Sequence, residues 1–370
     1  MPLYVIDAWR GFLPALDPLT TLPQEFAWLD DLGATLPLLL ENGHARKIIA
    51  SVPPINTQAL HQREAQRAFL IYSFLASAYV WAPGQKPLDR IPCGIALPLY
   101  TLGKRLGQPP IMSYASYALQ NWKRKNLQGP VALENLELLQ PFSGVPDEAW
   151  FILDHVQIEA EAAPGLIAIQ RALHACAHEK LEWLRIDLEC MTQALQVMLT
   201  TLKRMQEGCN PEVYWHSVRP YLFGFNNMLF EGVSAWKNKR RSLRGETGAQ
   251  SSIVPSFVAA LGIHHEKTAL TRHTRVMQYY MPPEHRQFIK NIRQGPSIRN
   301  YALRHAREHK ALKDAYNTCL MALQDFRAQH YEWARIYIHD RVPNPEGSGG
   351  TIFMPWLKLL VDETNAHLIT

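Results

Sequence analysis

The sequence predicts an all-α protein, and three observations support this fold class. Apolar residues recur every three or four positions along residues 57–81, 184–202 and 309–340, which is the pattern of helices that turn one face toward a core. No long stretch alternates strictly between apolar and polar residues, as a half-buried strand would. The 26 prolines fall in turns and at expected helix starts rather than inside these stretches.

The composition is that of an ordinary globular chain. Its 370 residues can form one large domain or two, and 47% are apolar and 19% charged. The net charge of +5 is too modest to indicate a nucleic-acid-binding protein. No window reaches the roughly 18 uncharged apolar residues of a membrane span, and the N-terminus lacks the features of a signal peptide. We therefore expect neither nucleic acid nor a membrane as a partner.

The five cysteines predict free thiols. They are odd in number and scattered, and no two form a CxxC pair, so neither a disulfide framework nor a structural zinc site is expected. This usage is typical of a cytoplasmic protein. The five are Cys93, Cys176, Cys190, Cys209 and Cys319.

The first part of the chain alternates between broken and regular segments. Residues 1–56 are rich in proline and predict only short pieces of structure. Residues 57–81 predict a buried helix that opens on Asn56 or Thr57 as its N-terminal cap.

Two tyrosines follow a proline pair. Pro109 and Pro110 predict the start of a helix. On that helix Tyr114 and Tyr117, three residues apart, lie on the same side.

A linker divides the chain. Residues 141–149 carry the turn residues Pro, Ser and Gly, and we place a domain boundary there. The expected architecture is a smaller, mainly helical N-terminal domain, residues 1–143, and a large helical-bundle domain, residues 144–370.

Three polar residues interrupt the apolar run that follows. Asp154, His155 and Glu159 lie within a predicted helix whose other residues are mostly apolar. Buried polar groups need partners. Either these side chains form a polar edge against a neighbouring element, or they have a function.

Residues 211–233 are rich in aromatic side chains and hold a single cation, Arg219. Such a set suits a flat, partly apolar ligand with a carboxylate, because rings stack on aromatic surfaces and a guanidinium binds an acid with two hydrogen bonds. The alternative is that Arg219 pairs with an acid or carbonyl of the protein. The basic run at 236–244 is interpreted as a solvated loop.

Two small-residue segments can approach a ligand closely. In GETGAQSS, residues 245–252, glycines allow the backbone near a bound group, and Thr247, Ser251 and Ser252 offer hydroxyls. The segment lacks the GK[ST] ending of a phosphate loop. The Gly- and Pro-rich loop 339–351 can be mobile and close over a site.

The helix predicted for residues 309–340 places His330 on its apolar stripe. A core-facing imidazole either is a hydrogen-bonded core histidine or binds a ligand. Arg327, one turn earlier, lies beside the stripe and can pair with an anionic group next to the imidazole.

Six segments in register resemble the indoleamine 2,3-dioxygenases. They cover roughly residues 50 to 370. In order they are IPCGIALPLYTLGKRLGQPPIMSYASYALQNWKRKN, RPYLFGF, GETGAQSS with FVAALGI, YYMPPEHRQFI, FRAQHYEWARIYI and GSGGTIFMPWLK.

The resemblance implies an all-helical heme enzyme whose N-terminal domain covers the distal side of the heme. Its expected cofactor is heme b with its iron. The implied reaction cleaves the indole C2–C3 bond of L-tryptophan, or of a related indole, with dioxygen to give N-formylkynurenine. This is the first step of the kynurenine pathway. An electron donor must keep the heme reduced.

Site residues are carried over by matching positions. His330 matches the proximal axial ligand of the heme iron, and Arg327 matches the arginine that holds a propionate. Arg219 matches the arginine that binds the substrate carboxylate. The other substrate-binding positions are the aromatics Tyr114, Phe151 and Tyr214, then Thr247 and Gly248 near the heme edge and the substrate ammonium, and Ser348 in the glycine-rich loop.

His155 matches a distal position that is serine in some members of the family and histidine in others. A neutral imidazole there can accept a hydrogen bond from the indole N–H and orient the ring, so we assign it the catalytic position. Tyr117, which is also a predicted substrate-binding residue, stands where some members have a smaller cysteine, and GETG departs from the GGSAG form. Tyr117 and Thr247 keep one rival open, a related heme enzyme that oxygenates a different or substituted indole in secondary metabolism. A rival of another class is a heme-based gas sensor without turnover.

Overall fold

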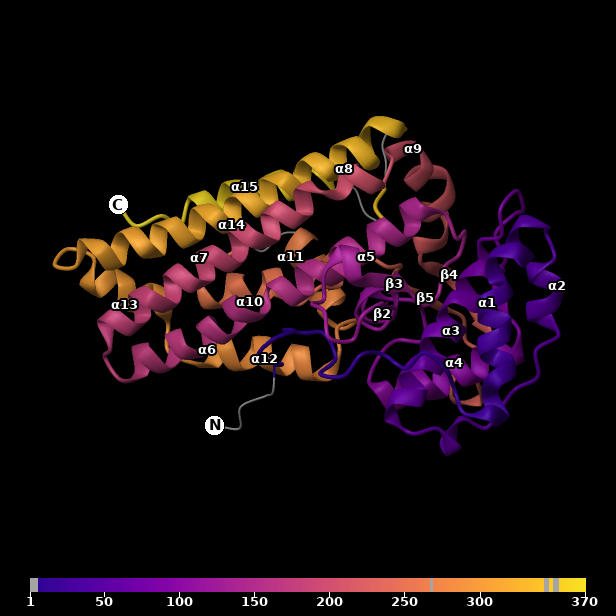
Figure 1. Ribbon diagram of the computed structural model, residues 1–370. Coiled ribbons are helices and arrows are strands. Elements are labelled where there is room, and N and C mark those ends of the chain that lie inside the picture. Colours follow the sequence, from indigo (N-terminus) through magenta and orange to yellow (C-terminus); the bar gives the residue numbers. More distant parts are fainter. Residues whose placement is uncertain (1–5, 267–268, 343–345, 349–352) are drawn as a thin grey trace.

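The computed structural model describes residues 6–266, 269–342, 346–348 and 353–370. Helices dominate, and the strands are short (Figure 1), which confirms the predicted all-α class. The α-helices are α1 (Ala27–Glu41), α2 (Ala45–Ala50), α3 (Gln62–Val80), α4 (Cys93–Leu106), α5 (Pro146–Glu161), α6 (Ala163–Ala177), α7 (Leu181–Lys203), α8 (Met205–Gly208), α9 (Pro211–Val213), α10 (Ile253–Ala260), α11 (Ala269–Gln278), α12 (Pro283–Gln294), α13 (Ile298–His305), α14 (Lys310–Tyr337) and α15 (Met354–Asn365). The strands are β1 (Arg90–Ile91), β2 (Trp122–Arg124), β3 (Leu136–Leu138), β4 (Phe225–Phe230) and β5 (Arg241–Leu243).

Long helices α6, α7, α14 and α15 run side by side and form one end of the molecule (Figure 1). The apolar stripe predicted on α14 is buried against this bundle through Leu312, Tyr316, Leu320 and Leu323. Burying one such side chain contributes about 1.5–3 kcal/mol. The bundle is therefore a firm support for whatever the C-terminal half of α14 carries.

Helices α1 to α4 form the opposite end, with α5 and the strands between the two ends (Figure 1). The expectation that the first 56 residues form only short pieces is wrong, because α1 has 15 residues despite Pro37 within it. A proline leaves the carbonyl four residues earlier without its helical hydrogen bond. Here that carbonyl belongs to Gly33, and the Gln140 amide nitrogen donates to it at 2.8 Å.

The start predicted for the next helix is also wrong. Asn56 caps a short 3-10 turn, accepting a hydrogen bond from the Gln58 backbone N–H at 3.0 Å. Helix α3 begins at Gln62, six residues after Asn56, and is capped by His61, whose backbone N–H donates to the Glu64 carboxylate at 2.7 Å. This reciprocal cap is a stronger helix start than a single side-chain oxygen.

The strands join the two ends. In the sheet β1-β4-β5, β1 lies parallel to β4 with Arg90 opposite Leu229, and β4 lies antiparallel to β5. The second sheet pairs β2 with β3. Residues 225–243 thus return to pack against the first part of the chain. We keep the division into 1–143 and 144–370 as a proposal. Within the described residues, no helix is both long and apolar enough to span a membrane.

Candidate functional site

His330 lies in the C-terminal half of α14. Much of its side-chain surface is open, yet protein surrounds it so closely that burial lowers the pKa of the imidazole to about 4. It forms no hydrogen bond with any described residue. The ring is therefore neutral near pH 7 and has a free nitrogen lone pair.

His155, on α5, is near enough to His330 for the two imidazoles to interact electrostatically. After burial, the charge of His155 is the second cause that lowers the pKa of His330. The His155 Nδ1 atom is 2.7 Å from the Phe151 carbonyl oxygen. A carbonyl can only accept, so we assign the hydrogen to Nδ1 and a free lone pair to Nε2. Burial also lowers the pKa of His155, so the region between the two rings, called here the His155–His330 space, contains two neutral imidazoles.

Four aromatic rings form a continuous wall beside His155. The centroid of the Phe151 ring is 4.8 Å from those of both His155 and Tyr214. It is 6.4 Å from the Tyr117 centroid. The Tyr114 ring lies 6.0 Å from that of His155. The structure thus brings together five of the predicted residues, and we call the four rings with His155 the aromatic wall.

Two π-helical turns shape this wall. Tyr117 lies in the π-turn Ala115–Leu119, with Tyr114 as its N-terminal cap, so the regular helix expected there is absent. Tyr214 begins a second π-turn, Tyr214–Val218. A π-turn closes its hydrogen bonds over five residues instead of four and re-aims side chains, which is why such turns recur at functional sites.

Arg219 lies between two aromatic rings. Its guanidinium carbon is 4.5 Å from the centroid of Trp215 and 4.7 Å from that of Phe223. Its Nη2 atom donates to the Glu346 carbonyl oxygen at 2.5 Å, and its Nε atom has no partner. Burial lowers the pKa of this arginine. No acidic residue of the described chain forms an ion pair with Arg219. The alternative that this arginine pairs with a carbonyl of the protein is therefore present, but a carbonyl does not neutralise the charge of the guanidinium.

Arg327 is buried one turn before His330 and faces α15. Its Nη1 atom donates to the Leu360 carbonyl oxygen at 2.9 Å and to the Thr364 hydroxyl. Its Nε atom is buried without a partner. Burial lowers the pKa of Arg327 to about 10, because the contacts around it do not fully replace the solvation of its charge.

The segment GETG lies against the glycine-rich loop. The Ser348 hydroxyl donates to the Glu246 carbonyl oxygen. The Thr247 hydroxyl accepts from the Ala249 backbone N–H at 3.4 Å. A side chain placed at Gly248 would meet nothing within 4 Å, so open space adjoins this residue. Residues 343–345 and 349–351 of the loop, and hence its predicted closure, lie outside the described residues.

Gly245 is a glycine for a different reason from the one expected. A Cβ atom there would lie 2.2 Å from the Leu222 carbonyl oxygen and 2.6 Å from that of Ser348. The missing side chain therefore lets three segments of the protein meet, rather than a ligand approach.

Sequence reasoning missed two residues of this region. Glu246 is buried, and its place in the GETG departure was the only signal. Gln250 accepts from the Tyr114 backbone N–H at 2.9 Å and donates to the Gly245 carbonyl oxygen at 2.9 Å. It thereby holds the π-turn of the aromatic wall beside GETG, and no pattern in the sequence indicated this bridge.

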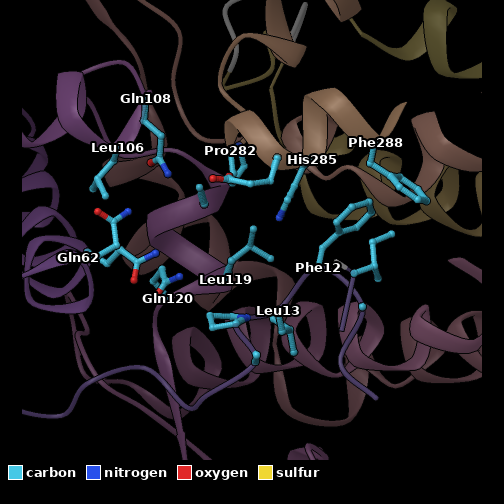
Figure 2. Close-up of a pocket in the computed structure, with 17 residues that line it drawn as sticks. Phe12, Leu13, Gln62, Leu106, Gln108, Leu119, Gln120, Pro282, His285 and Phe288 are labelled. Atoms are coloured by element: carbon cyan, nitrogen blue, oxygen red, sulfur yellow. The ribbon is translucent and has the colours of Figure 1, made fainter. Parts of the chain in front are cut away.

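A separate cavity of about 260 Å³ lies between the N-terminal segment, the first π-turn and α12 (Figure 2). Phe12, Leu119 and His285 are among its lining residues. The His285 imidazole contacts the Ser252 hydroxyl at 3.2 Å. None of the predicted site residues lines this cavity, so it is distinct from the His155–His330 space.

Comparison with known proteins assigns the family. A family model described as indoleamine 2,3-dioxygenase matches residues 1–344. Indoleamine 2,3-dioxygenase 1 of Rattus norvegicus is 32% identical over 394 residues, covering 99% of this chain and 95% of the rat protein.

Two further relatives come from Saccharomyces cerevisiae and Fusarium equiseti. Indoleamine 2,3-dioxygenase of Saccharomyces cerevisiae is 31% identical over 422 residues, with 98% of this chain and 92% of the yeast protein covered. A 6-hydroxytryptophan 2,3-dioxygenase of Fusarium equiseti is 29% identical over 350 residues, with 90% and 84% covered. These matches confirm the resemblance seen in the sequence, and the chain belongs to the indoleamine 2,3-dioxygenase family.

Proposed function

We propose that this protein is a heme-dependent dioxygenase that cleaves the indole C2–C3 bond of L-tryptophan, or of a related indole, to give N-formylkynurenine. Family membership supports the reaction class. One observation supports assigning this reaction to a particular site: the imidazole of His330 is surrounded by protein but has no hydrogen-bond partner among the described residues. His155 is near enough to interact with it electrostatically.

The residues present fit heme b. His330, with a free nitrogen and open surface, would hold the heme iron. Arg327, three residues earlier on the same helix, has an unpaired buried N–H that a propionate would satisfy. Thr247 and Gly248 would lie at the heme edge. Bound heme would supply the iron that activates dioxygen.

The protein's own side chains bind and orient the substrate. Arg219 would take the substrate carboxylate, since its charge is buried and not neutralised. The aromatic wall would enclose the indole and exclude water. Ser348 and Thr247 would contact the amino-acid end of the substrate.

His155 would orient the indole. Its Nε2 lone pair is free because Nδ1 is held by the Phe151 carbonyl, so Nε2 can accept the indole N–H. No proton needs to leave the indole in this role, and the ring therefore acts by positioning.

The setting of the reaction is also part of the proposal. All five cysteines are free thiols, which supports a reducing compartment such as the cytoplasm. A cytoplasmic electron donor would keep the heme iron reduced.

A second candidate is a substituted indole as the natural substrate. The Tyr117 hydroxyl is buried without a hydrogen-bond partner, and a polar substituent on the ring could supply one. The relative from Fusarium equiseti is named for 6-hydroxytryptophan, which supports keeping this candidate.

Turnover under labelled dioxygen tests the proposal. The reduced, heme-loaded protein is mixed with L-tryptophan under ¹⁸O₂, and the product is analysed by mass spectrometry. We expect N-formylkynurenine with two labelled oxygen atoms. Heme-loaded protein that leaves both L-tryptophan and hydroxytryptophans unchanged would contradict the dioxygenase assignment.

A further inference from the structure

Glu246 is a buried acid whose carboxyl group has no partner. Only 4% of the residue is exposed. Its backbone is held on both sides, because its N–H donates to the Leu222 carbonyl oxygen at 3.0 Å and its own carbonyl accepts from the Ser348 hydroxyl. No described residue donates a hydrogen bond to the carboxyl oxygens. A carboxyl removed from water in this way requires a compensating donor.

The carboxyl lies at the aromatic wall. Gln250 links the neighbouring Gly245 carbonyl oxygen to the Tyr114 backbone N–H. The charge of Glu246 is among the causes that raise the pKa values of Tyr114, Tyr117 and Tyr214. The Tyr117 hydroxyl is likewise buried without a partner. Two polar groups without a hydrogen-bond partner among the described residues therefore belong to the same region, whose wall is otherwise made of ring surfaces.

A structural role for Glu246 does not fit the pattern set by Glu148, which is also buried. The Glu148 carboxylate accepts four hydrogen bonds, from the backbone N–H groups of Phe142, Ser143 and Gly144 and from the Ser143 hydroxyl, at 2.6 to 3.1 Å. That carboxylate fixes a loop to the start of α5. The Glu246 carboxyl fixes no described residue, so it is available to a bound molecule.

We propose that Glu246, together with the Tyr117 hydroxyl, is a specificity-determining pair that receives an N–H or O–H donor of the bound indole. This inference rests on the proposed function and names what the pocket selects. The donor has two sources with the same chemistry: the α-ammonium group of the amino acid, or a hydroxyl group on the indole ring.

The electrostatics agree with this role. Burial raises the pKa of Glu246 to about 8. A donor with positive charge would stabilise the ionised carboxylate, and a hydroxyl would bind it in either protonation state. A substrate without a donor would leave the buried acceptor unpaired, and such a mismatch is the strongest basis of discrimination that a pocket has.

Ligand binding to the heme-loaded protein tests the pair without requiring turnover. Dissociation constants are measured by calorimetry for L-tryptophan, for indole-3-propionate, which lacks the ammonium group, and for 5- and 6-hydroxytryptophan. The variants are Glu246→Gln, of the same shape, and Tyr117→Phe. Glu161→Gln, a partly buried acid outside the aromatic wall, is the matched control.

The expected result is a loss confined to ligands with the relevant donor. If the ammonium is the donor, Glu246→Gln weakens the binding of all three amino acids about 10-fold or more and leaves indole-3-propionate unchanged. If a ring hydroxyl is the donor, only a hydroxytryptophan is weakened. Equal effects on all four ligands, or no effect, would overturn the proposal.

Binding to the wild-type protein tests the proposal even if the variants fail to fold. It must bind a ligand with a donor more tightly than the matched ligand without one, and equal affinities would overturn the proposal. Failure of the proposed function is distinguishable: tight, selective binding without any labelled product removes the dioxygenase assignment and leaves the recognition pair standing.

Discussion

The two sides of the His155–His330 space are built in different ways. One side is α14, a single helix of 28 residues whose buried stripe anchors His330 and Arg327 to the bundle. The other side is the aromatic wall, assembled from two π-turns, α5 and the loop segment that holds Glu246. We infer that the two sides have different roles: α14 holds the cofactor, and the aromatic wall selects the substrate.

Removing the key side chain of α14 should have the largest effect. His330→Ala deletes the proposed axial ligand, so we expect stable heme binding to be lost. The absorption spectrum of the purified, heme-reconstituted variant measures this. His309→Ala, an exposed histidine just before the same helix, should bind heme as the wild type does. An unchanged heme spectrum in His330→Ala would remove the axial assignment.

Removing the cation next to the aromatic wall should act on the substrate instead. A hydrogen bond to a charged group contributes about 1.5–3 kcal/mol, so Arg219→Leu should raise the KM for L-tryptophan roughly 10- to 150-fold. Heme content should stay close to that of the wild type. Arg219→Lys keeps the charge and should lose less. Turnover kinetics unchanged in Arg219→Leu would show that this arginine lies outside the site.

Asp154, on α5, tests whether the side of the site that includes the aromatic wall lowers the free energy of unfolding. Both of its carboxyl oxygens are buried without partners, and burial raises its pKa to about 8, with Glu161 adding to the rise. The folded state therefore keeps this proton to a higher pH than the unfolded state does, and the free energy of unfolding should fall as the pH rises from about 4 to about 8.

Asp154→Asn should remove that fall. Denaturant unfolding at pH 5 and pH 9 should show the variant gaining on the wild type by roughly 4 kcal/mol at the higher pH, since about three pH units separate pH 5 from the folded pKa and each unit corresponds to about 1.4 kcal/mol. Asp325→Asn, at an exposed position on α14, is the control. The same pH profile in Asp154→Asn and the wild type would mean that the carboxyl is solvated.

The smallest effect is expected at His155. One neutral hydrogen bond contributes about 0.5–1.5 kcal/mol, so His155→Ala should lower kcat/KM only about 2- to 12-fold. His155→Gln, which can still accept from the indole N–H, should recover part of the loss. A fall of 100-fold or more, with a new pH dependence of kcat, would point to general-base catalysis instead of positioning.

The sequence alone predicted the α14 side better than the opposite one. The apolar residues of α14 recur every three or four positions, and this local pattern is enough to predict that Leu312, Tyr316 and Leu320 face the core. The aromatic wall depends on contacts between segments far apart in the chain, such as Tyr114 with Gln250. The assignment of its residues to one site came only through the family resemblance, and their roles stay predictions.

The errors have local physical causes. Pro37 suggested a break, but Gln140, over a hundred positions away, caps the carbonyl that the proline leaves free. Asn56 is a good cap by type, yet the reciprocal cap of His61 and Glu64 starts the helix later. Glu246 could be noticed as a departure from the family pattern, but its burial could not be deduced from its neighbours.

The π-turns also bear on how this pocket can change over evolutionary time. A π-turn holds one residue more than an α-helical turn, and one residue corresponds to about 100° of rotation in a helix. Deleting a single residue of the chain just before Tyr117 or Tyr214 would rotate that ring away from the aromatic wall. Chain length, and not only residue identity, is therefore a heritable control on which indoles a member of this family admits.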